Sequence, residues 1–79
     1  MDMREVEIRG EMIRLGVLLK LVGVIDAGGE AKGYLAGGGV LVNGEPERRR
    51  GRQLFGGDRV MAGEEELVVL AERPGSWAT

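Results

Sequence analysis

Hydrophobic and polar residues change their spacing several times along the chain, and each change predicts an element of secondary structure. The segment REVEIR alternates charged and apolar residues and places Val6 and Ile8 on one face, which is typical of a half-buried strand. The segment LGVLLKLV has the spacing of an amphipathic helix, with an apolar stripe made of Leu15, Leu18, Leu19 and Val22. Gly23 is expected to end this helix.

A second short helix is predicted in the glycine-rich segment DAGGEAKGYLAGGG. We expect it to begin near Gly28 or Gly29 and to stop at the triple glycine 37–39. Its buried face would consist of Ala31, Tyr34 and Leu35, so that Lys32 points away from the core. Backbone N–H groups at the start of this helix are also candidates for holding a phosphate. Glu30 would compete for the same positive helix end, so a plain helix start is the simpler interpretation.

After the triple glycine the pattern changes to the two-residue period of strands. Val40 and Val42 share a face, and Asn43-Gly44 is the preferred pair for a type I′ hairpin turn, because both positions need a positive φ. Further on, Gly56-Gly57-Asp58 predicts a turn before a strand with the sequence RVMA at 59–62. A second turn is predicted at Gly63-Glu64, and it precedes a strand with the sequence ELVVL at 66–70.

Composition limits the possible classes of function. A chain of 79 residues makes one domain, since a second independent core would be too small to be stable. The chain has no cysteine and no histidine, which removes disulfides, thiolate catalysis, most metal sites and the usual general base. The N-terminus is charged, and no apolar run approaches the length of a membrane span. We therefore expect a cytoplasmic protein, and an enzyme is the weakest hypothesis.

Charge is distributed unevenly along a chain whose net charge is only −2. Residues 12–63 carry a net charge of +3, whereas the segments before and after them are acidic. Much of the positive charge lies in the segment ERRRGR, as Arg48, Arg49, Arg50 and Arg52. Guanidinium groups suit phosphate because their donors form a planar fork. The alternative is a solvated loop that keeps the protein soluble. The acidic run 64–66 is the one candidate for a hard metal, and a charged turn explains it better.

Several of these segments, taken in order, resemble a known family. The sequence IRLGVLLKLVGVIDAGGEAKGYLAGGGVLVNGEPE, followed by GDRV, is similar to the RNA-binding domain named after ribosomal protein S-four, also called the alpha-L motif. The resemblance covers residues 13–61 and is greatest to small stand-alone bacterial members that carry GGEAK. It implies an α+β fold in which two short helices pack on a small, bent, mostly antiparallel sheet.

The resemblance also implies which residues contact RNA. In this family the second helix and the adjoining strand loops face structured RNA, which nominates Lys32, Asn43, Gly44, Arg48, Arg49, Arg50 and Arg52. Many members have a serine and an arginine where this chain has Ala27 and Gly28, so one expected phosphate contact is missing. The arginine cluster is a candidate replacement for it.

Our interpretation is a non-catalytic RNA-binding module, with one domain over residues 1–73 and a flexible tail at 74–79. The expected partner of this monomer is structured RNA of ribosomal or transfer RNA type, with the ribosome as a candidate, and no cofactor, metal or membrane is expected. The alternative is a protein interaction module that uses a sheet edge or the tail.

Overall fold

The computed structural model describes residues 3–26 and 29–71. Within them the elements are β1 (Arg4–Ile8), β2 (Met12–Arg14), α1 (Leu15–Leu21), α2 (Glu30–Ala36), β3 (Val40–Val42), β4 (Glu45–Pro46), β5 (Gln53–Phe55), β6 (Arg59–Ala62) and β7 (Glu65–Ala71). The predictions about Ala27, Gly28 and the tail at 74–79 lie outside the described residues. The domain boundary at residue 73 therefore stays a prediction.

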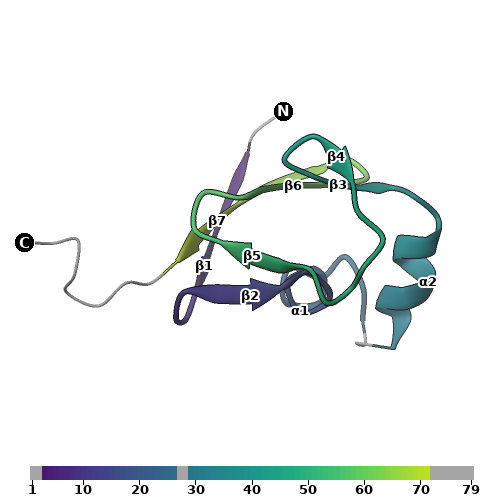
Figure 1. Ribbon diagram of the computed structural model, residues 1–79, viewed down its shortest axis with the longest axis horizontal. Coiled ribbons are helices and arrows are strands. Elements are labelled where there is room, and N and C mark those ends of the chain that lie inside the picture. Colours follow the sequence, from purple (N-terminus) through teal and green to yellow (C-terminus); the bar gives the residue numbers. More distant parts are fainter. Residues whose placement is uncertain (1–2, 27–28, 72–79) are drawn as a thin grey trace, which may run out of the picture.

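Five strands form a curved sheet in the order β1-β7-β6-β3-β4 (Figure 1). β1 pairs with β7 in parallel, and every other pair in this sheet is antiparallel. β2 and β5 form a separate antiparallel pair next to α1, while α2 lies at one end of the molecule (Figure 1). This arrangement confirms the predicted α+β class, with two short helices packed against a bent and mostly antiparallel sheet.

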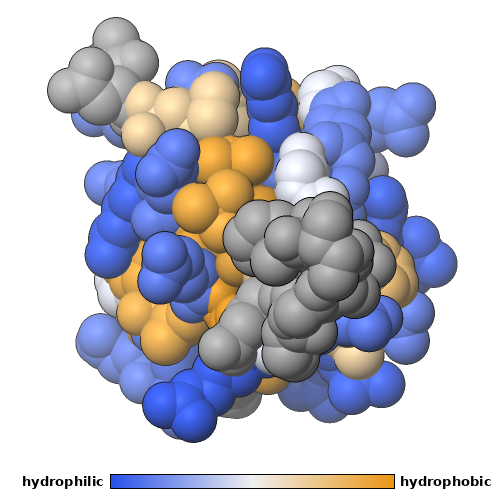
Figure 2. Space-filling view, turned by 90° about the vertical axis from the view of Figure 1, so that its left-hand side faces the viewer, coloured by the Kyte–Doolittle hydropathy of each residue, from blue (hydrophilic) through white to orange (hydrophobic). Residues whose placement is uncertain are grey.

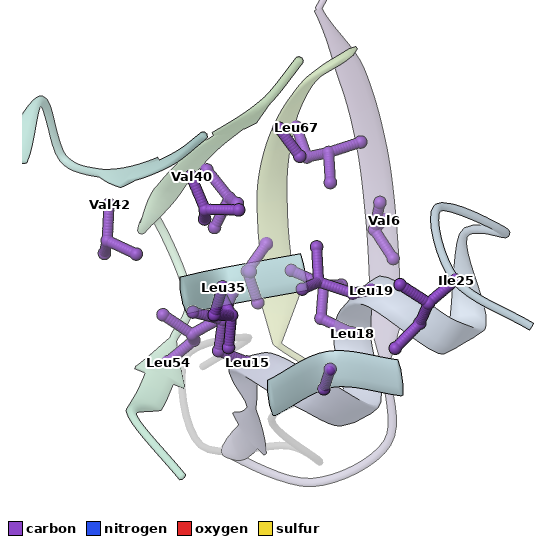
Figure 3. Close-up of a cluster of buried hydrophobic side chains, with 14 of the residues drawn as sticks. Val6, Leu15, Leu18, Leu19, Ile25, Leu35, Val40, Val42, Leu54 and Leu67 are labelled. Carbon is purple, nitrogen blue, oxygen red and sulfur yellow. The ribbon is translucent and has the colours of Figure 1, made fainter. Parts of the chain in front are cut away.

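The core lies between the curved sheet and the layer that contains α1 and the β2–β5 pair. Buried side chains from both helices, from five strands and from Ile25 after α1 meet there, and several of them are labelled in Figure 3. The apolar stripe predicted for α1 is confirmed, because Leu15, Leu18 and Leu19 are fully buried and Val22 packs against the core. On α2, Ala31 and Leu35 are buried and Tyr34 is half-buried, as its spacing predicted.

Gly23 ends α1 as predicted, and the reason is its backbone conformation. Its φ of +84° is one that residues with a side chain rarely adopt. In this conformation the Gly23 N–H donates to the Lys20 carbonyl at 3.1 Å, and the Val24 N–H donates to the Leu19 carbonyl at 2.9 Å. These two bonds are those of a Schellman motif, which satisfies the last carbonyl groups of a helix. Gly38, with a φ of +80°, follows the end of α2 in a similar left-handed conformation.

The strands at residues 4–8, 40–42, 59–62 and 65–71 agree with the predicted alternation, within a residue or two at their ends. β2 and β5 were not predicted. Each has three residues, and in β5 only Leu54 is buried, so the alternation is too short to stand out from loop sequence. Their pairing places residues 52 and 53 next to the start of α1, which fixes the arginine-rich segment described below.

Candidate nucleic-acid interface

The arginine-rich segment, residues 47–52, connects β4 to β5 and passes beside α2 toward the start of α1 (Figure 1). Two of its carbonyl groups accept hydrogen bonds from the first turn of α1. The Gly16 N–H donates to the Arg50 carbonyl, and the Leu15 N–H donates to the Arg52 carbonyl, both at 2.9 Å. Since helix-start N–H groups have no partner within their own helix, these bonds satisfy both α1 and the segment. The segment is therefore held against the fold.

Glu47 is the one buried charged residue among those described, with an exposed fraction of 6%. Its Oε2 atom accepts hydrogen bonds from Nε and from the backbone N–H of Arg49, both at 3.0 Å. Its Oε1 atom accepts from Nη1 of Arg52 at 2.7 Å and from Nη2 of Arg49 at 3.3 Å. The hydrogen bonds from Arg49 are the main reason that the pKa of Glu47 falls from 4.5 to about 2, so the carboxylate is charged at neutral pH.

The Glu47 contacts divide the four arginines of the predicted cluster into two pairs. Arg49 and Arg52 bind the carboxylate and hold the segment together. Arg48 and Arg50 are exposed, and within the described residues neither has a carboxylate at ion-pair distance. Three consecutive side chains thus point in different directions, and the first and third remain available for an anion.

A shallow hollow of about 420 Å³ lies between α1, α2 and the arginine-rich segment; its lining residues are Arg14, Gly16, Val17, Lys20, Ala31, Arg50 and Gly51. Three of these residues are basic and none is acidic. Gly16 allows the close approach of the three parts, because a Cβ atom there would lie 3.3 Å from Cβ of Arg50 and 3.4 Å from Cβ of Ala31. The positive charge of Arg50 is thus joined by that of Arg14 and Lys20.

Lys32 is exposed on α2, directly after Ala31, which lines this hollow. The guanidinium of Arg48 lies near the other end of α2, since its Nη2 atom is 3.7 Å from where a Cβ of Gly38 would be. We call the set of these exposed cations the basic surface; its members are Arg14, Lys20, Lys32, Arg48 and Arg50. These cations lie around both helices, although the net charge of the chain is negative.

The side chain of Asn43 makes hydrogen bonds within the fold. Asn43 and Gly44 have φ values of 53° and 86°, as the predicted hairpin turn requires. Nδ2 of Asn43 donates to Oδ1 of Asp58 at 3.1 Å, and its Oδ1 accepts from the Arg59 N–H at 2.9 Å. Oδ2 of Asp58 accepts in turn from the Phe55 N–H at 2.7 Å. The side chain of Asn43 therefore ties the β3–β4 turn to the start of β6.

The structure does not bring all the predicted RNA-binding residues to one place. Asn43 and Gly44 line a second hollow, of about 430 Å³, together with residues of β3, β6 and β7. This hollow shares no lining residue with the one beside Arg50. The turn and the hollow beside Arg50 are consequently two separate regions of the molecule.

An apolar area lies at the end of the molecule away from α2, and Figure 2 shows it between hydrophilic surfaces. Phe55, the last residue of β5, is 49% exposed and lines a hollow together with Leu70 and Ala71. Glu11 is the one charged residue among the described lining residues. No cation is among the described residues that line this hollow, so none of them could pair with a phosphate.

Within residues 3–26 and 29–71, no group of three acidic side chains is placed to hold a metal ion, and this covers the acidic run 64–66. No helix in the same part of the chain has the length and hydropathy needed to cross a membrane.

Sequence reasoning missed several residues of this interface. Arg14 and Lys20 are separated from the arginine cluster in sequence, and only the packing of α1 against residues 50 and 51 brings them beside Arg50. Glu47 had a weak local signal, since it is an acidic residue at the start of a basic run. Its burial depends on tertiary structure and could not be derived from that pattern.

Comparison with known proteins agrees with this architecture. The S4 domain family matches residues 6–70, and the chain belongs to that family. The resemblance inferred from the sequence motifs is thereby confirmed. A relative from Bacillus subtilis (strain 168), named as the probable ribosome maturation protein RlbA, is 54% identical to this chain over 55 residues. The aligned region spans 70% of this chain and 78% of the relative.

Proposed function

We propose that this chain is a non-catalytic RNA-binding module that binds structured ribosomal RNA during ribosome maturation. The observation that carries the proposal is the arrangement of the arginine-rich segment, in which Glu47 fixes two arginines and leaves Arg48 and Arg50 exposed beside the helices. Membership of the S4 domain family and the similarity to a probable ribosome maturation protein support the same function. We further propose that the protein acts as a cytoplasmic monomer.

Phosphate groups would be bound chiefly by Lys32, Arg48 and Arg50, whose charges are exposed. Arg49 would bind phosphate as well as Glu47. Its side chain is 75% exposed, and some of its N–H donors stay available while it binds the carboxylate. Arg52 is more enclosed and mainly positions the segment. Gly44 is exposed in the hairpin turn, where its backbone and that of Asn43 would approach a second part of the RNA. Double-stranded RNA is recognised largely by shape and by such backbone contacts.

Salt dependence of binding tests this function directly. Each phosphate neutralised by a cation releases counterions, so log K should fall linearly with log salt by about 0.7 to 0.9 per contact. We expect a structured ribosomal RNA fragment to bind with a slope of about −3. The variant Arg48→Ala/Arg50→Ala should weaken binding to many structured RNAs and flatten the slope by about one to two.

The matched control is Arg4→Ala/Arg9→Ala, which removes the same charge from two exposed arginines at the ends of β1. It should change the slope much less than the first double variant does. If both double variants keep the wild-type affinity and slope, the arginine-rich segment is a solvated loop and the proposal is wrong.

A protein interaction module is the second candidate, and Phe55, an aromatic side chain that is 49% exposed beside a hollow, favours it. Crosslinking in cells, followed by sequencing of attached RNA, separates the two functions. Recovery of ribosomal RNA above background supports RNA binding. Recovery of a protein partner that survives RNase treatment, without enriched RNA, supports the second candidate.

A further inference from the structure

The hollow beside Arg50 combines two chemical properties that a phosphate contact alone does not need. Its lining includes the small or apolar residues Gly16, Val17 and Ala31, together with three cations, which are Arg14, Lys20 and Arg50. Val17 is 57% exposed, so an apolar side chain faces water beside these cations. A single exposed valine is ordinary, but an apolar lining and three cations in one hollow together fit a ligand that has both an apolar face and an anionic group.

We propose that this hollow binds one unpaired nucleotide of the RNA, with its base against Val17 and its phosphates against the three cations. The proposal rests on the proposed function and adds a class of RNA target, namely a helix with a bulged or looped-out nucleotide. A nucleotide matches both properties of the site, since its base has apolar faces and its phosphates are anionic. Bulged bases are unstacked and are common targets of proteins that recognise RNA.

The size and the boundaries of the hollow fit this ligand. Its volume of about 420 Å³ lies within the range of roughly 300–1,000 Å³ found for small-molecule sites. The first turn of α1 does not compete for the phosphate, because the N–H groups of Leu15 and Gly16 already donate to the arginine-rich segment. The anion is therefore left to the side chains of the three lining cations. A planar guanidinium can also stack on a base while it carries positive charge.

Gly16 lets α1 and the arginine-rich segment approach each other closely beside the hollow. Its Cβ would lie 3.3 Å from Cβ of Arg50 and 3.4 Å from the Arg50 carbonyl oxygen, so a side chain at this position would project into the junction of α1 and the segment. Gly16 lies in the first turn of a helix and has no positive φ that would require glycine. Close packing, rather than backbone conformation, accounts for the glycine.

Two RNA hairpins that differ by one bulged nucleotide test the inference. The bulged position carries 2-aminopurine, whose fluorescence reports whether the base is stacked. The wild-type protein should bind the bulged hairpin about three- to tenfold more tightly than the fully paired one, as expected for burial of one base face. Binding should also change the fluorescence of the bulged base.

The critical variant is Val17→Ala, and its matched control is Leu21→Ala. The two positions lie one turn apart on α1 with nearly equal exposed fractions of 57% and 58%, but Leu21 does not line the hollow. Val17→Ala should remove most of the preference for the bulged hairpin and leave the salt slope on the paired hairpin unchanged. Leu21→Ala should keep the preference.

The outcomes separate this inference from the function on which it rests. Equal affinity for both hairpins, with a normal salt slope and no effect of Val17→Ala, overturns the nucleotide site and leaves RNA binding intact. No binding to either hairpin under any salt condition contradicts the proposed function itself. Loss of preference in both variants shows that the exposed apolar residues of α1 act non-specifically, which also overturns the site.

Discussion

The Nη1 atom of Arg52 lies 2.7 Å from Oε1 of Glu47, and this ion pair joins the first and last residues of the arginine-rich segment. The same carboxylate holds Arg49, so one buried negative charge organises two arginines of the cluster. A buried charge is stable only when it is paired and hydrogen-bonded, and Glu47 meets both conditions. The conformation of this segment therefore depends on an acidic residue as much as on its arginines.

The ionisation of Glu47 predicts a pH dependence of stability. The hydrogen bonds from Arg49 lower the pKa of Glu47 from 4.5 to about 2, so the folded state favours the charged form. This contribution is fully present above pH 4.5 and is lost as the pH falls toward about 2. The free energy of unfolding of the wild type should thus fall toward that of Glu47→Gln when urea denaturation is repeated from about pH 6 to about pH 3.

The control for this experiment is Glu45→Gln, at an exposed glutamate on β4. Its unfolding free energy should follow that of the wild type across the same pH range. A difference between wild type and Glu47→Gln that stays constant with pH would show that the carboxylate gains nothing from its charge.

Substitutions at Asn43 can separate an effect on stability from an effect on RNA binding. Asn43→Gly keeps the positive φ but removes the bonds to Asp58 and to the Arg59 N–H, and we expect a loss of about 1 kcal/mol. Asn43→Ala should lose more, because alanine is also strained at a φ of 53°. Thermal or urea denaturation measures both values.

RNA affinity, measured under conditions in which both Asn43 variants are folded, then decides the role of the side chain. Unchanged affinity means that Asn43 acts by shaping the turn. A large loss of affinity in Asn43→Gly, with an unchanged salt slope because the side chain is neutral, means that the side chain contacts RNA despite its bonds within the fold.

The extent to which sequence predicted this structure depends on how local each signal is. The leucines of α1 repeat with a helical period and identified both the helix and its buried face. Asn43-Gly44 identified the hairpin because few residue pairs adopt two positive φ values. The separation of the arginines into two pairs depends on the burial of Glu47, which results from tertiary packing. The sequence did not identify Arg14 and Lys20 as part of the candidate interface because their position beside Arg50 also results from tertiary packing.

The buried leucines give a direct test of the core. Leu19 and Leu35 are fully buried, from α1 and α2 respectively, and face the interior in Figure 3. Replacement of either by alanine should lower the free energy of unfolding by about 2 to 5 kcal/mol, which is a large share of the stability of a small domain. Leu21→Ala, at an exposed position of α1, should change it by less than about 0.5 kcal/mol. Losses of similar size at all three positions would show that the buried face is assigned wrongly.

Two helical glycines should respond in opposite ways when a side chain is added. Gly33 lies inside α2, and a Cβ there would meet no atom within 4 Å, so Gly33→Ala should stabilise the protein by about 0.5 to 1 kcal/mol through helix propensity. Gly16 packs against Arg50 and Ala31, so the larger side chain in Gly16→Val should push the arginine-rich segment away from α1 and destabilise the fold. Urea denaturation of both variants measures the contrast. Equal tolerance at the two sites would mean that the segment yields easily, and the Leu15 and Gly16 N–H bonds would then contribute little to its position.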